Sequence, residues 1–392
     1  MLGSPLVRAR TCAITIAAAA AACFIPPAAA ASASFYDPPD PLPAGAPGDV
    51  IRSERVVRTP FPGVRVQRIL YRSTKATGGS TAVSGMVLTP SRSRRGAPLV
   101  GISPGFPGMA DKCAPSRTIP TGTSVEDLLI APLLERGYTV AVTDYQGLGT
   151  PGEHEYVVGA SEAHAVLDVI RAARRLPGTK VAPDGPVAVS GYSQGGHGAM
   201  FTAELQPSYA PDVKLAGVAA GGLPGDFEAL ADFMDGAWFA PLLPSVAIAY
   251  DAAYPELDMD SLLTPRGRRV VDHIRRGCIV DILTGPGIFE KSASFTTRDL
   301  LKDPAWLARL RENRAGMRKP ATPLFLYHSR ADQGLPFAQA LATRERYCAL
   351  GTTVLWRELH FTEHALGFVS GVPHVVNWLD ARLRGEPAPT NC

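Results

Sequence analysis

One ten-residue stretch, residues 187–196, constrains the fold of this chain more than any other. It reads Val-Ala-Val-Ser-Gly-Tyr-Ser-Gln-Gly-Gly, an apolar run that ends in the pattern Gly-x-Ser-x-Gly at Gly191, Ser193 and Gly195. A short apolar run predicts a buried strand, and the residues from about 196 to 205 are compatible with a helix. The stretch therefore predicts a sharp turn from a strand into a helix, with Ser193 at its apex.

A serine on such a turn exposes its hydroxyl at the top of a sheet, where it can act as a nucleophile. The backbone crowds around the turn, so the residues two before and two after the serine need almost no side chain, and Gly191 and Gly195 meet that demand. The pattern alone is weak, because the chain has 38 glycines and short motifs match by chance. The flanking strand and helix patterns favour a nucleophile at Ser193.

The first 33 residues predict a secretory signal peptide. Arg8 and Arg10 give it a positive start, residues 12–25 form an alanine-rich apolar run, and Ala-x-Ala cleavage sites follow. The run is too short to span a bilayer. We therefore expect an exported protein with no transmembrane segment in the mature chain.

Charge and cysteine content agree with export. The chain has 39 Lys and Arg against 36 Asp and Glu, and without Arg8 and Arg10 it is nearly neutral, which argues against binding to nucleic acid. Four cysteines remain in the mature chain, and they predict two disulfides with three possible pairings. We favour Cys113–Cys278 and Cys348–Cys392, since the second bond would pin the C-terminal residue. None has Cys-x-x-Cys spacing, so no structural metal site is expected.

Short apolar runs alternate with helical patterns along most of the mature chain, after a Pro- and Gly-rich arm at 34–48. Strands are expected at 64–71, 81–88, 98–102, 139–143, 186–190, 215–219, 323–328 and 353–359. Helices are expected at 124–136, at 160–176 and after Ser193. Strands that alternate with helices predict an α/β fold, in which a mostly parallel sheet is flanked by helices.

The alternation stops between residues 226 and 319, which are mostly helical by pattern. An insertion after the sixth predicted strand would lie over the C-terminal ends of the strands, where open α/β sheets hold their sites. We therefore expect a catalytic domain formed by 49–225 and 320–392, with 226–319 as a helical cap or lid. Ordinary core helices are the alternative.

A serine nucleophile needs a base to take its proton and a third group to orient the base. In hydrolases built on this turn, the order along the chain is Ser, then Asp or Glu, then His. Asp332 directly follows the predicted strand 323–328, and His364 lies in the loop beyond strand 353–359. We therefore assign Asp332 as the acid and His364 as the base.

Other acids and histidines are weaker candidates. His360 is an alternative base but lies almost on its strand, and Asp281 is an alternative acid inside the predicted cap. The remaining histidines, His154 among them, are expected to be surface or packing residues, although His197 could line the site from the helix after Ser193.

The negative charge that develops during ester cleavage needs two backbone donors, together called an oxyanion hole. The first is the N–H of Gln194, which follows the nucleophile at a helix N-terminus. The second is expected from the loop at 104–108, Pro-Gly-Phe-Pro-Gly. Pro107 has no N–H, so Phe106 is the first choice and Gly105 the second. No metal or organic cofactor is implied.

Several further motifs are shared with a known family. They are Phe35-Tyr-Asp-Pro-Pro, Cys113-Ala-Pro-Ser, Asp144-Tyr-Gln-Gly-Leu-Gly, the turn at Ser193 and Trp378-Leu-Asp-Ala-Arg-Leu-Arg-Gly. From 35 to 392 the chain resembles the secretory lipases of actinobacteria and yeasts, an α/β-hydrolase family with a helical cap. The resemblance implies hydrolysis of triacylglycerols or related lipid esters, the triad Ser193, Asp332 and His364, and the favoured disulfide pairing. One departure is Pro104-Gly105, where related hydrolases often have His-Gly.

The sequence thus predicts a secreted serine lipase that acts through an acyl-enzyme on Ser193. Its partner would be a lipid ester, free or at a lipid–water interface. A carboxylesterase for short soluble esters and an acyltransferase with the same acyl-enzyme are the alternatives. A lipid-binding protein without activity is disfavoured, because Ser, Asp and His are all present in the required order.

Overall fold

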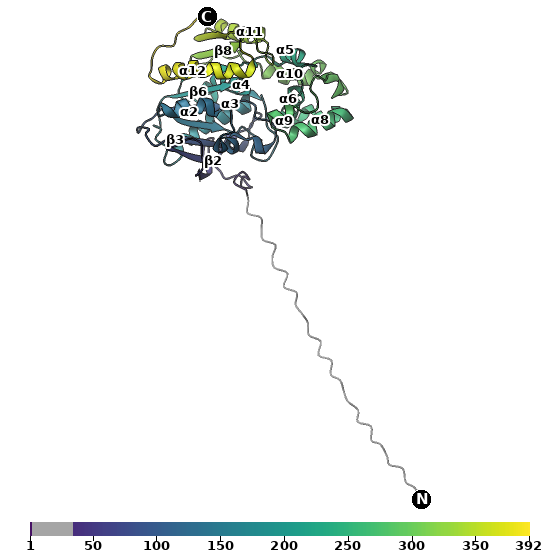
Figure 1. Cartoon of the computed structure of the whole chain (residues 1–392), viewed down its shortest axis with the longest axis horizontal. Coiled ribbons are helices and arrows are strands. Elements are labelled where there is room, and N and C mark those ends of the chain that lie inside the picture. The colour runs from purple at the N-terminus through teal and green to yellow at the C-terminus, as the bar shows by residue number, and fades with distance from the viewer. Residues whose placement is uncertain (2–33) are drawn as a thin grey trace. The chain divides into compact units, whose positions relative to one another are not determined.

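A single nine-stranded sheet forms the centre of the computed structural model, which describes Met1 and residues 34–392 (Figure 1). The strands are β1 (Val50–Val56), β2 (Val64–Thr74), β3 (Ser80–Pro90), β4 (Leu99–Ser103), β5 (Thr139–Thr143), β6 (Val187–Tyr192), β7 (Leu215–Gly221), β8 (Leu324–Ser329) and β9 (Val354–Leu359). They are ordered β1-β2-β3-β5-β4-β6-β7-β8-β9 across the sheet. The predicted signal peptide lies outside the described residues, Met1 apart.

The sheet is antiparallel at one side and parallel at the other. The pairings β1–β2, β2–β3 and β3–β5 are antiparallel, and every pairing from β5–β4 to β8–β9 is parallel. Every residue of β4, β5, β6 and β8 is buried, as continuous apolar runs require when helices cover both faces. The predicted mostly parallel α/β fold is confirmed.

Helices cover the two faces of the sheet in separate hydrophobic layers. Side chains of α3 (Gly159–Arg175), α4 (Gln194–Tyr209) and α11 (Phe337–Ala349) pack in one layer. Those of α2 (Asp127–Glu135) and α12 (His364–Leu383) pack in the other. Helix α4 starts directly at the residue after Ser193, so the strand-to-helix turn sits at the C-terminal edge of the sheet.

Strand β1 is absent from the sequence prediction. Its residues, Val-Ile-Arg-Ser-Glu-Arg-Val, are half-buried or exposed, and it pairs only with β2 at the edge of the sheet. Charged residues are common on edge strands because they discourage pairing with other chains, and here they hide the strand pattern. As a consequence, the helical insertion follows the seventh strand of the chain and not the sixth.

Between β7 and β8 the described chain forms helices, which we call the helical insertion (residues 226–319). They are α5 (Phe227–Met234), α6 (Leu242–Ala253), α7 (Met259–Leu262), α8 (Pro265–Arg275), α9 (Ile279–Leu283) and α10 (Pro304–Glu312). They lie together at one end of the sheet (Figure 1) and enclose a third hydrophobic cluster. Across the described residues, no helix has both the length and the apolar character to cross a bilayer.

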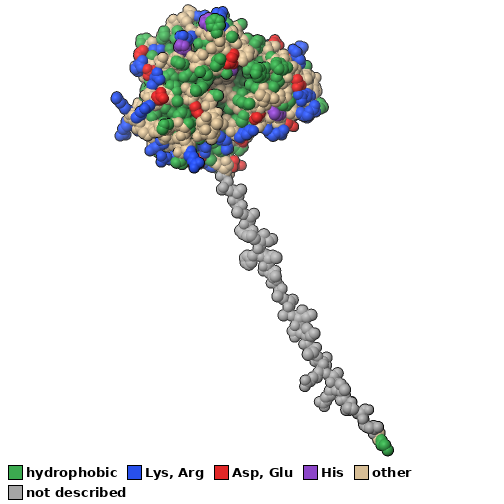
Figure 2. Space-filling model, viewed as in Figure 1, with side chains coloured by type: hydrophobic (Ala, Val, Ile, Leu, Met, Phe, Trp, Pro, Cys, Tyr) green, Lys and Arg blue, Asp and Glu red, His purple; other side chains and the backbone are tan. Residues whose placement is uncertain are grey.

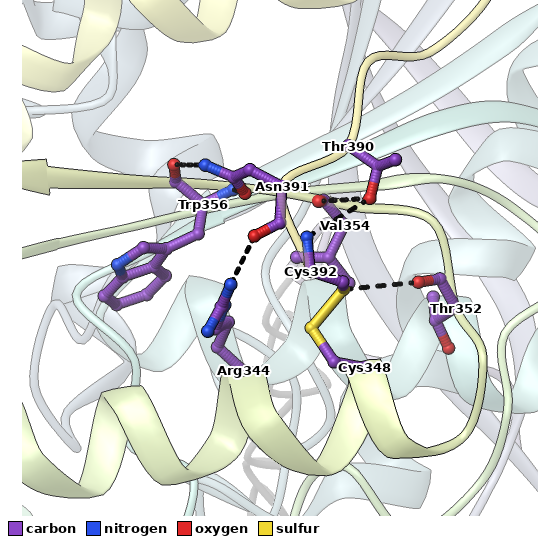
Figure 3. The surroundings of a disulfide bond; sticks show 8 residues. All are labelled: Arg344, Cys348, Thr352, Val354, Trp356, Thr390, Asn391 and Cys392. Atoms are coloured by element: carbon purple, nitrogen blue, oxygen red, sulfur yellow. Dashed lines mark hydrogen bonds between the residues drawn. A yellow bond between two sulfur atoms is a disulfide. The ribbon is translucent and has the colours of Figure 1, made fainter.

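Two disulfides hold segments that are far apart in the sequence, and both have the favoured pairing. Cys348 of α11 is bonded to Cys392 (Figure 3). Beside it, Asn391 accepts the Trp356 N–H at 2.7 Å and donates its own N–H to Val354 at 3.0 Å, so the C-terminal residues are tied to β9. The other bond, Cys113–Cys278, joins the region after β4 to the helical insertion.

Candidate active site

Ser193 lies on a strained turn between β6 and α4. Its φ is 58° and its ψ is −122°, a conformation that non-glycine residues rarely adopt unless the surroundings impose it. A Cβ on Gly191 would lie 2.0 Å from the Gly195 carbonyl oxygen, and one on Gly195 would lie 1.9 Å from the Ser103 oxygen. The two glycines of the motif are therefore a steric requirement of the turn.

The three predicted triad side chains meet at the C-terminal ends of the strands. His364 Nε2 lies 3.0 Å from Ser193 Oγ, and His364 Nδ1 lies 2.7 Å from Asp332 Oδ2. The other oxygen of Asp332 accepts the N–H groups of Gly334 and Leu335 at 2.9 and 2.8 Å. This is the order of contacts in which a histidine can take a serine proton while a carboxylate orients the ring.

The charge of Asp332 is set by its partners. Burial alone would raise its pKa, but the hydrogen bond from His364 and the charges of His364 and His328 outweigh burial and hold the pKa below its usual value. The group is therefore a carboxylate at neutral pH and can orient the His364 ring.

His364 is placed by the start of helix α12. Glu363 caps this helix by accepting the N–H groups of Ala365 and Leu366 at 2.8 and 2.6 Å. The Tyr192 hydroxyl donates to the His364 carbonyl oxygen at 2.7 Å. His360, the alternative base, is exposed beside Phe361.

The loop at 104–108 leaves one of its expected donors available. The Gly105 N–H donates to Glu126 Oε1 at 2.8 Å, whereas within the described residues the Phe106 N–H makes no hydrogen bond. Gln194 is the first residue of α4, where helical N–H groups have no partner in their own helix. Of the three N–H groups that the sequence suggests as donors, those of Phe106 and Gln194 have no partner within the described residues, and that of Gly105 has one.

Ser193 and His364 line a cavity of about 490 Å³, whose other walls come mainly from the helical insertion. Most of its lining is apolar and includes Phe227, Leu230, Met234, Leu242, Leu263 and Phe295. On the face shown in Figure 2, hydrophobic side chains gather around a hollow between the sheet and the insertion. A cavity of this size and lining suits an apolar group of a small molecule.

A buried hydrogen-bond network beneath the turn is missing from the sequence prediction. His154 and Glu162 are fully buried, and both contact the Gln194 side chain, at 2.9 and 2.8 Å from its Nε2. Glu162 also contacts His197 Nδ1 at 2.7 Å. Of the two roles predicted for His154, surface or packing, its burial leaves packing. The one sequence feature that marks this position is the glycine-rich run 147–152, which comes just before His154 in the chain.

The fold and the site together define an α/β hydrolase, with a serine on a strand-to-helix turn and a histidine and a carboxylate behind it. The chain belongs to the secretory lipase family, whose model matches residues 113–391. Membership of a secretory family and two disulfides agree with the predicted export.

Relatives in this family include yeast enzymes. The chain is 27% identical over 387 residues to Lipase 5 of Candida albicans, covering 91% of this chain and 82% of that protein. It is 28% identical over 380 residues to the secreted triacylglycerol lipase LIP3 of Malassezia restricta, covering 90% and 79%.

Solved structures with this fold include lipases and esterases. Candida antarctica lipase A in its closed state matches with a TM-score of 0.82 at 22% identity, over 92% of this chain and 89% of that one. The rice cell wall degrading esterase LipA from Xanthomonas oryzae matches with a TM-score of 0.73 at 23% identity, over 88% and 100%. At these identities the similarity shows the fold.

Proposed function

We propose that this chain is a secreted serine hydrolase that cleaves lipid esters, with Ser193 as nucleophile. The observation that carries the proposal is the unbroken chain of contacts from Ser193 through His364 to Asp332, at the wall of an apolar cavity. Residues 1–33 would be removed on export, and the helical insertion would serve as the cap that forms the cavity.

The reaction proceeds in two halves. His364 takes the Ser193 proton while Oγ attacks the ester carbonyl carbon, and the resulting oxyanion accepts the N–H groups of Gln194 and Phe106. The intermediate collapses, His364 passes its proton to the departing alcohol, and the acyl group stays on Ser193. Water then attacks the acyl-enzyme with His364 as base, which releases the fatty acid and restores the serine.

The substrate is a triacylglycerol or a related lipid ester. Two features support this choice: the apolar lining of the cavity, which suits an acyl chain, and the naming of a relative as a secreted triacylglycerol lipase. The fatty acyl group would lie among the apolar side chains of the insertion, with its ester carbonyl at Ser193.

The decisive experiment replaces the nucleophile. S193A should lower kcat on nitrophenyl and glyceride esters by about 10⁴-fold or more and abolish labelling by a fluorophosphonate. S370A, a change at an exposed serine of α12, is the matched control and should behave as wild type. An S193A enzyme with the wild-type rate would refute the mechanism.

A chain-length series separates the lipase from its alternatives. We expect activity to rise from acetyl to medium and long acyl esters, because each buried methylene adds about 0.8 kcal/mol of favourable transfer free energy. A preference for dissolved acetyl and butyryl esters would instead indicate a carboxylesterase. Ester products in the presence of added alcohol would indicate an acyltransferase.

Apolar side chains around His364 point to contact with a lipid surface. Phe361, Leu366 and Val369 are 99%, 54% and 48% exposed, and Phe361 has a left-handed φ of 62°. These side chains lie near His364, which lines the cavity, and apolar side chains exposed in such a place would be buried at a lipid surface. Phe361→Ser should lower activity on emulsified triacylglycerol more than on dissolved esters. Val57→Ser, at another exposed apolar residue (83%), should change neither.

A further inference from the structure

His154 links the two backbone segments that hold the proposed oxyanion donors. Its Nδ1 lies 3.0 Å from the Gly108 carbonyl oxygen, and its Nε2 lies 2.9 Å from Gln194 Nε2. A carbonyl oxygen only accepts, so Nδ1 carries the ring proton and Nε2 accepts from the Gln194 amide. Burial lowers the pKa of His154 to about 4, which keeps the ring neutral at the pH where a serine hydrolase works.

On the helix side, the Gln194 side chain is held by two buried acceptors. One N–H of its amide donates to His154 and the other donates to Glu162 Oε1 at 2.8 Å. Glu162 is itself fixed, because the same oxygen accepts the Val157 N–H at 3.0 Å. With its side chain held at both hydrogens, Gln194 has little freedom to rotate, and its backbone N–H keeps its direction.

On the loop side, the His154 ring lies in a stack of aromatic side chains. It is nearly parallel to Tyr145, with ring centres 5.8 Å apart, and it faces Phe106 at 5.9 Å. The Tyr145 hydroxyl donates to the Pro104 carbonyl oxygen at 2.9 Å. The ring thus packs on Phe106, and Nδ1 bonds to Gly108 two residues further along the same loop.

The same loop is tied from other directions. The Gly105 N–H donates to Glu126, and the Pro107 carbonyl oxygen accepts the Ile279 N–H of the helical insertion at 2.8 Å. Of the two N–H groups that the sequence offered as donors from this loop, only that of Phe106 is without a partner in the described chain. The loop is therefore held on both sides of the one group that would meet the oxyanion.

A tight turn delivers His154 to this place. Gly147 has φ 70°, and a Cβ there would lie 1.8 Å from the Glu153 carbonyl oxygen. The Glu155 N–H donates to the Gln146 oxygen at 3.1 Å, which closes the turn. Only glycine can occupy position 147 without moving the segment that carries His154.

We propose that His154 is a positioning residue that sets the distance and direction between the Gln194 and Phe106 N–H groups. The inference rests on the proposed function, because both donors belong to that mechanism. His154 neither contacts the reacting atoms nor transfers a proton. It acts by coupling helix α4 to the loop at 104–108, so that the oxyanion finds both donors already in place.

Three substitutions at His154 test its two hydrogen bonds, to Gly108 and to Gln194, together and one at a time. His154→Phe keeps an aromatic ring and removes both bonds, His154→Asn can keep the bond to Gly108, and His154→Gln can keep the bond to Gln194. We expect H154F to lower kcat by about 10- to 100-fold with KM changed by less than about threefold, since small displacements of catalytic donors have effects of this size. H154N and H154Q should fall between H154F and wild type.

The matched control is His164→Phe. His164 is half-buried, stacks on Tyr209 at 3.8 Å and lies 3.1 Å from the Thr74 carbonyl oxygen, so it resembles His154 in surroundings but lies in another network. H164F should keep the wild-type kcat. Rates are expressed per active site, counted as the protein labelled by fluorophosphonate at completion.

A second readout separates positioning from loss of structure. An alkyl boronic acid, which forms a tetrahedral adduct on the serine, should bind H154F more weakly by the factor lost in kcat, whereas a non-hydrolysable ether analogue of the substrate should bind as it does to wild type.

If H154F does not fold, H154N and H154Q carry the same comparison. Wild-type kcat and boronate affinity in the folded variants, or equal losses in H164F, would overturn the inference. Retained activity in S193A would overturn the proposed function as well, so the two failures are distinguishable.

Discussion

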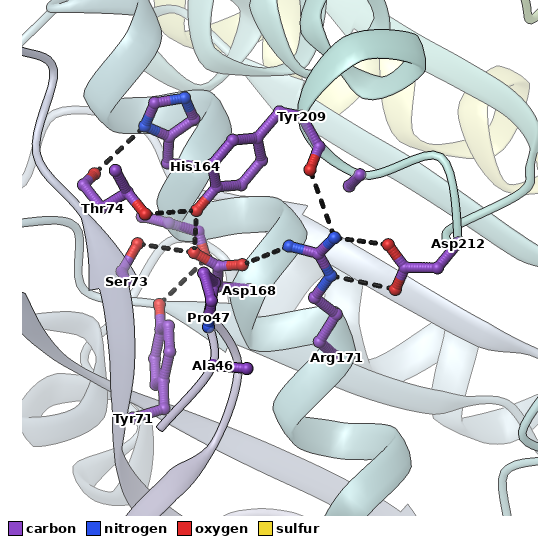
Figure 4. A network of polar contacts seen from close by, with 12 residues as sticks. Ala46, Pro47, Tyr71, Ser73, Thr74, His164, Asp168, Arg171, Tyr209 and Asp212 are labelled. Carbon is purple, nitrogen blue, oxygen red and sulfur yellow. Dashed lines mark hydrogen bonds and ion pairs between the residues drawn. The ribbon is translucent and has the colours of Figure 1, made fainter. Parts of the chain in front are cut away.

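Helix α3 carries two buried polar networks that look alike and hold different parts of the molecule. Near its N-terminus, Glu162 contacts the Gln194 amide and His197. Further along, Asp168 accepts hydrogen bonds from Ser73 at 2.8 Å, Tyr209 at 2.6 Å and Arg171 at 3.0 Å (Figure 4). Both carboxylates are fully buried, and both networks contain a histidine beside a tyrosine.

The difference lies in where the hydrogen bonds end. The Glu162 network ends on the turn that carries Ser193 and, through His154, on the loop at 104–108. The Asp168 network ends on β2 and on the last turn of α4. A buried polar cluster therefore reveals a functional role only through the backbone it holds.

The largest expected effect is a loss of stability on replacement of Asp168, whose network holds β2 and α4 together. Asp168→Leu leaves Arg171, Ser73 and Tyr209 without their shared acceptor. Breaking a buried ion pair from one side typically costs about 3–5 kcal/mol, and because Arg171 keeps its ion pair with Asp212, we expect the lower end, about 3 kcal/mol. We expect the free energy of unfolding in urea to fall by that amount at pH 8, with kcat per labelled active site within about twofold of wild type. A larger loss of kcat would show that the Asp168 network, like the Glu162 network, affects activity, and would contradict the difference drawn between the two.

The same replacement at Glu162, whose network ends on the turn that carries Ser193, should lower kcat. Glu162→Leu removes the acceptor for the Gln194 amide and for the Val157 N–H, and we expect kcat per active site to fall about tenfold, equivalent to about 1.4 kcal/mol, beyond any loss of stability. Glu162→Gln retains an acceptor and should recover most of the rate. Equal kcat values in E162L and D168L would show that the Glu162 network is only structural.

A further prediction concerns the dependence of stability on pH, at a third buried carboxyl. Burial raises the pKa of Glu126, which holds the Gly105 N–H, to about 7 from its usual 4.5. The folded state therefore binds the proton more tightly, and this contribution to stability is complete below about pH 4.5 and is lost as the pH rises through 7. Relative to E126Q, the unfolding free energy of wild type should fall by up to about 1.4 kcal/mol per pH unit across this window.

Glu135→Gln, at an exposed residue at the far end of α2, is the control for this measurement. It should keep the wild-type dependence of unfolding free energy on pH between 4.5 and 7. An E126Q enzyme with that same dependence would show that Glu126 does not carry the proton.

Sequence patterns predicted those parts of the fold that short-range sterics determine. The runs at 139–143 and 186–190, each with a Val-Ala-Val centre, were predicted as strands, and residues 139–143 and 187–192 are buried strands in the structure. The turn at Ser193 follows because Gly191 and Gly195 leave room for it. The edge strand β1 was missed because exposed charges break its pattern. The order Ser193, Asp332, His364 narrowed the triad candidates, and the structure brings these three side chains together.

What the sequence by itself determined is the strand-to-helix turn, the mostly parallel sheet and the short set of residues from which a triad could be chosen. Only the tertiary structure decided that His364 and not His360 faces Ser193, that Gly105 is occupied while Phe106 is free, and that His154 connects Gln194 to Gly108. The physical reason is the separation along the chain of the residues that interact. A turn or a strand depends on neighbours in the chain, whereas the hydrogen bonds of His154 reach residues 40 and 46 positions away, and packing alone brings those residues together.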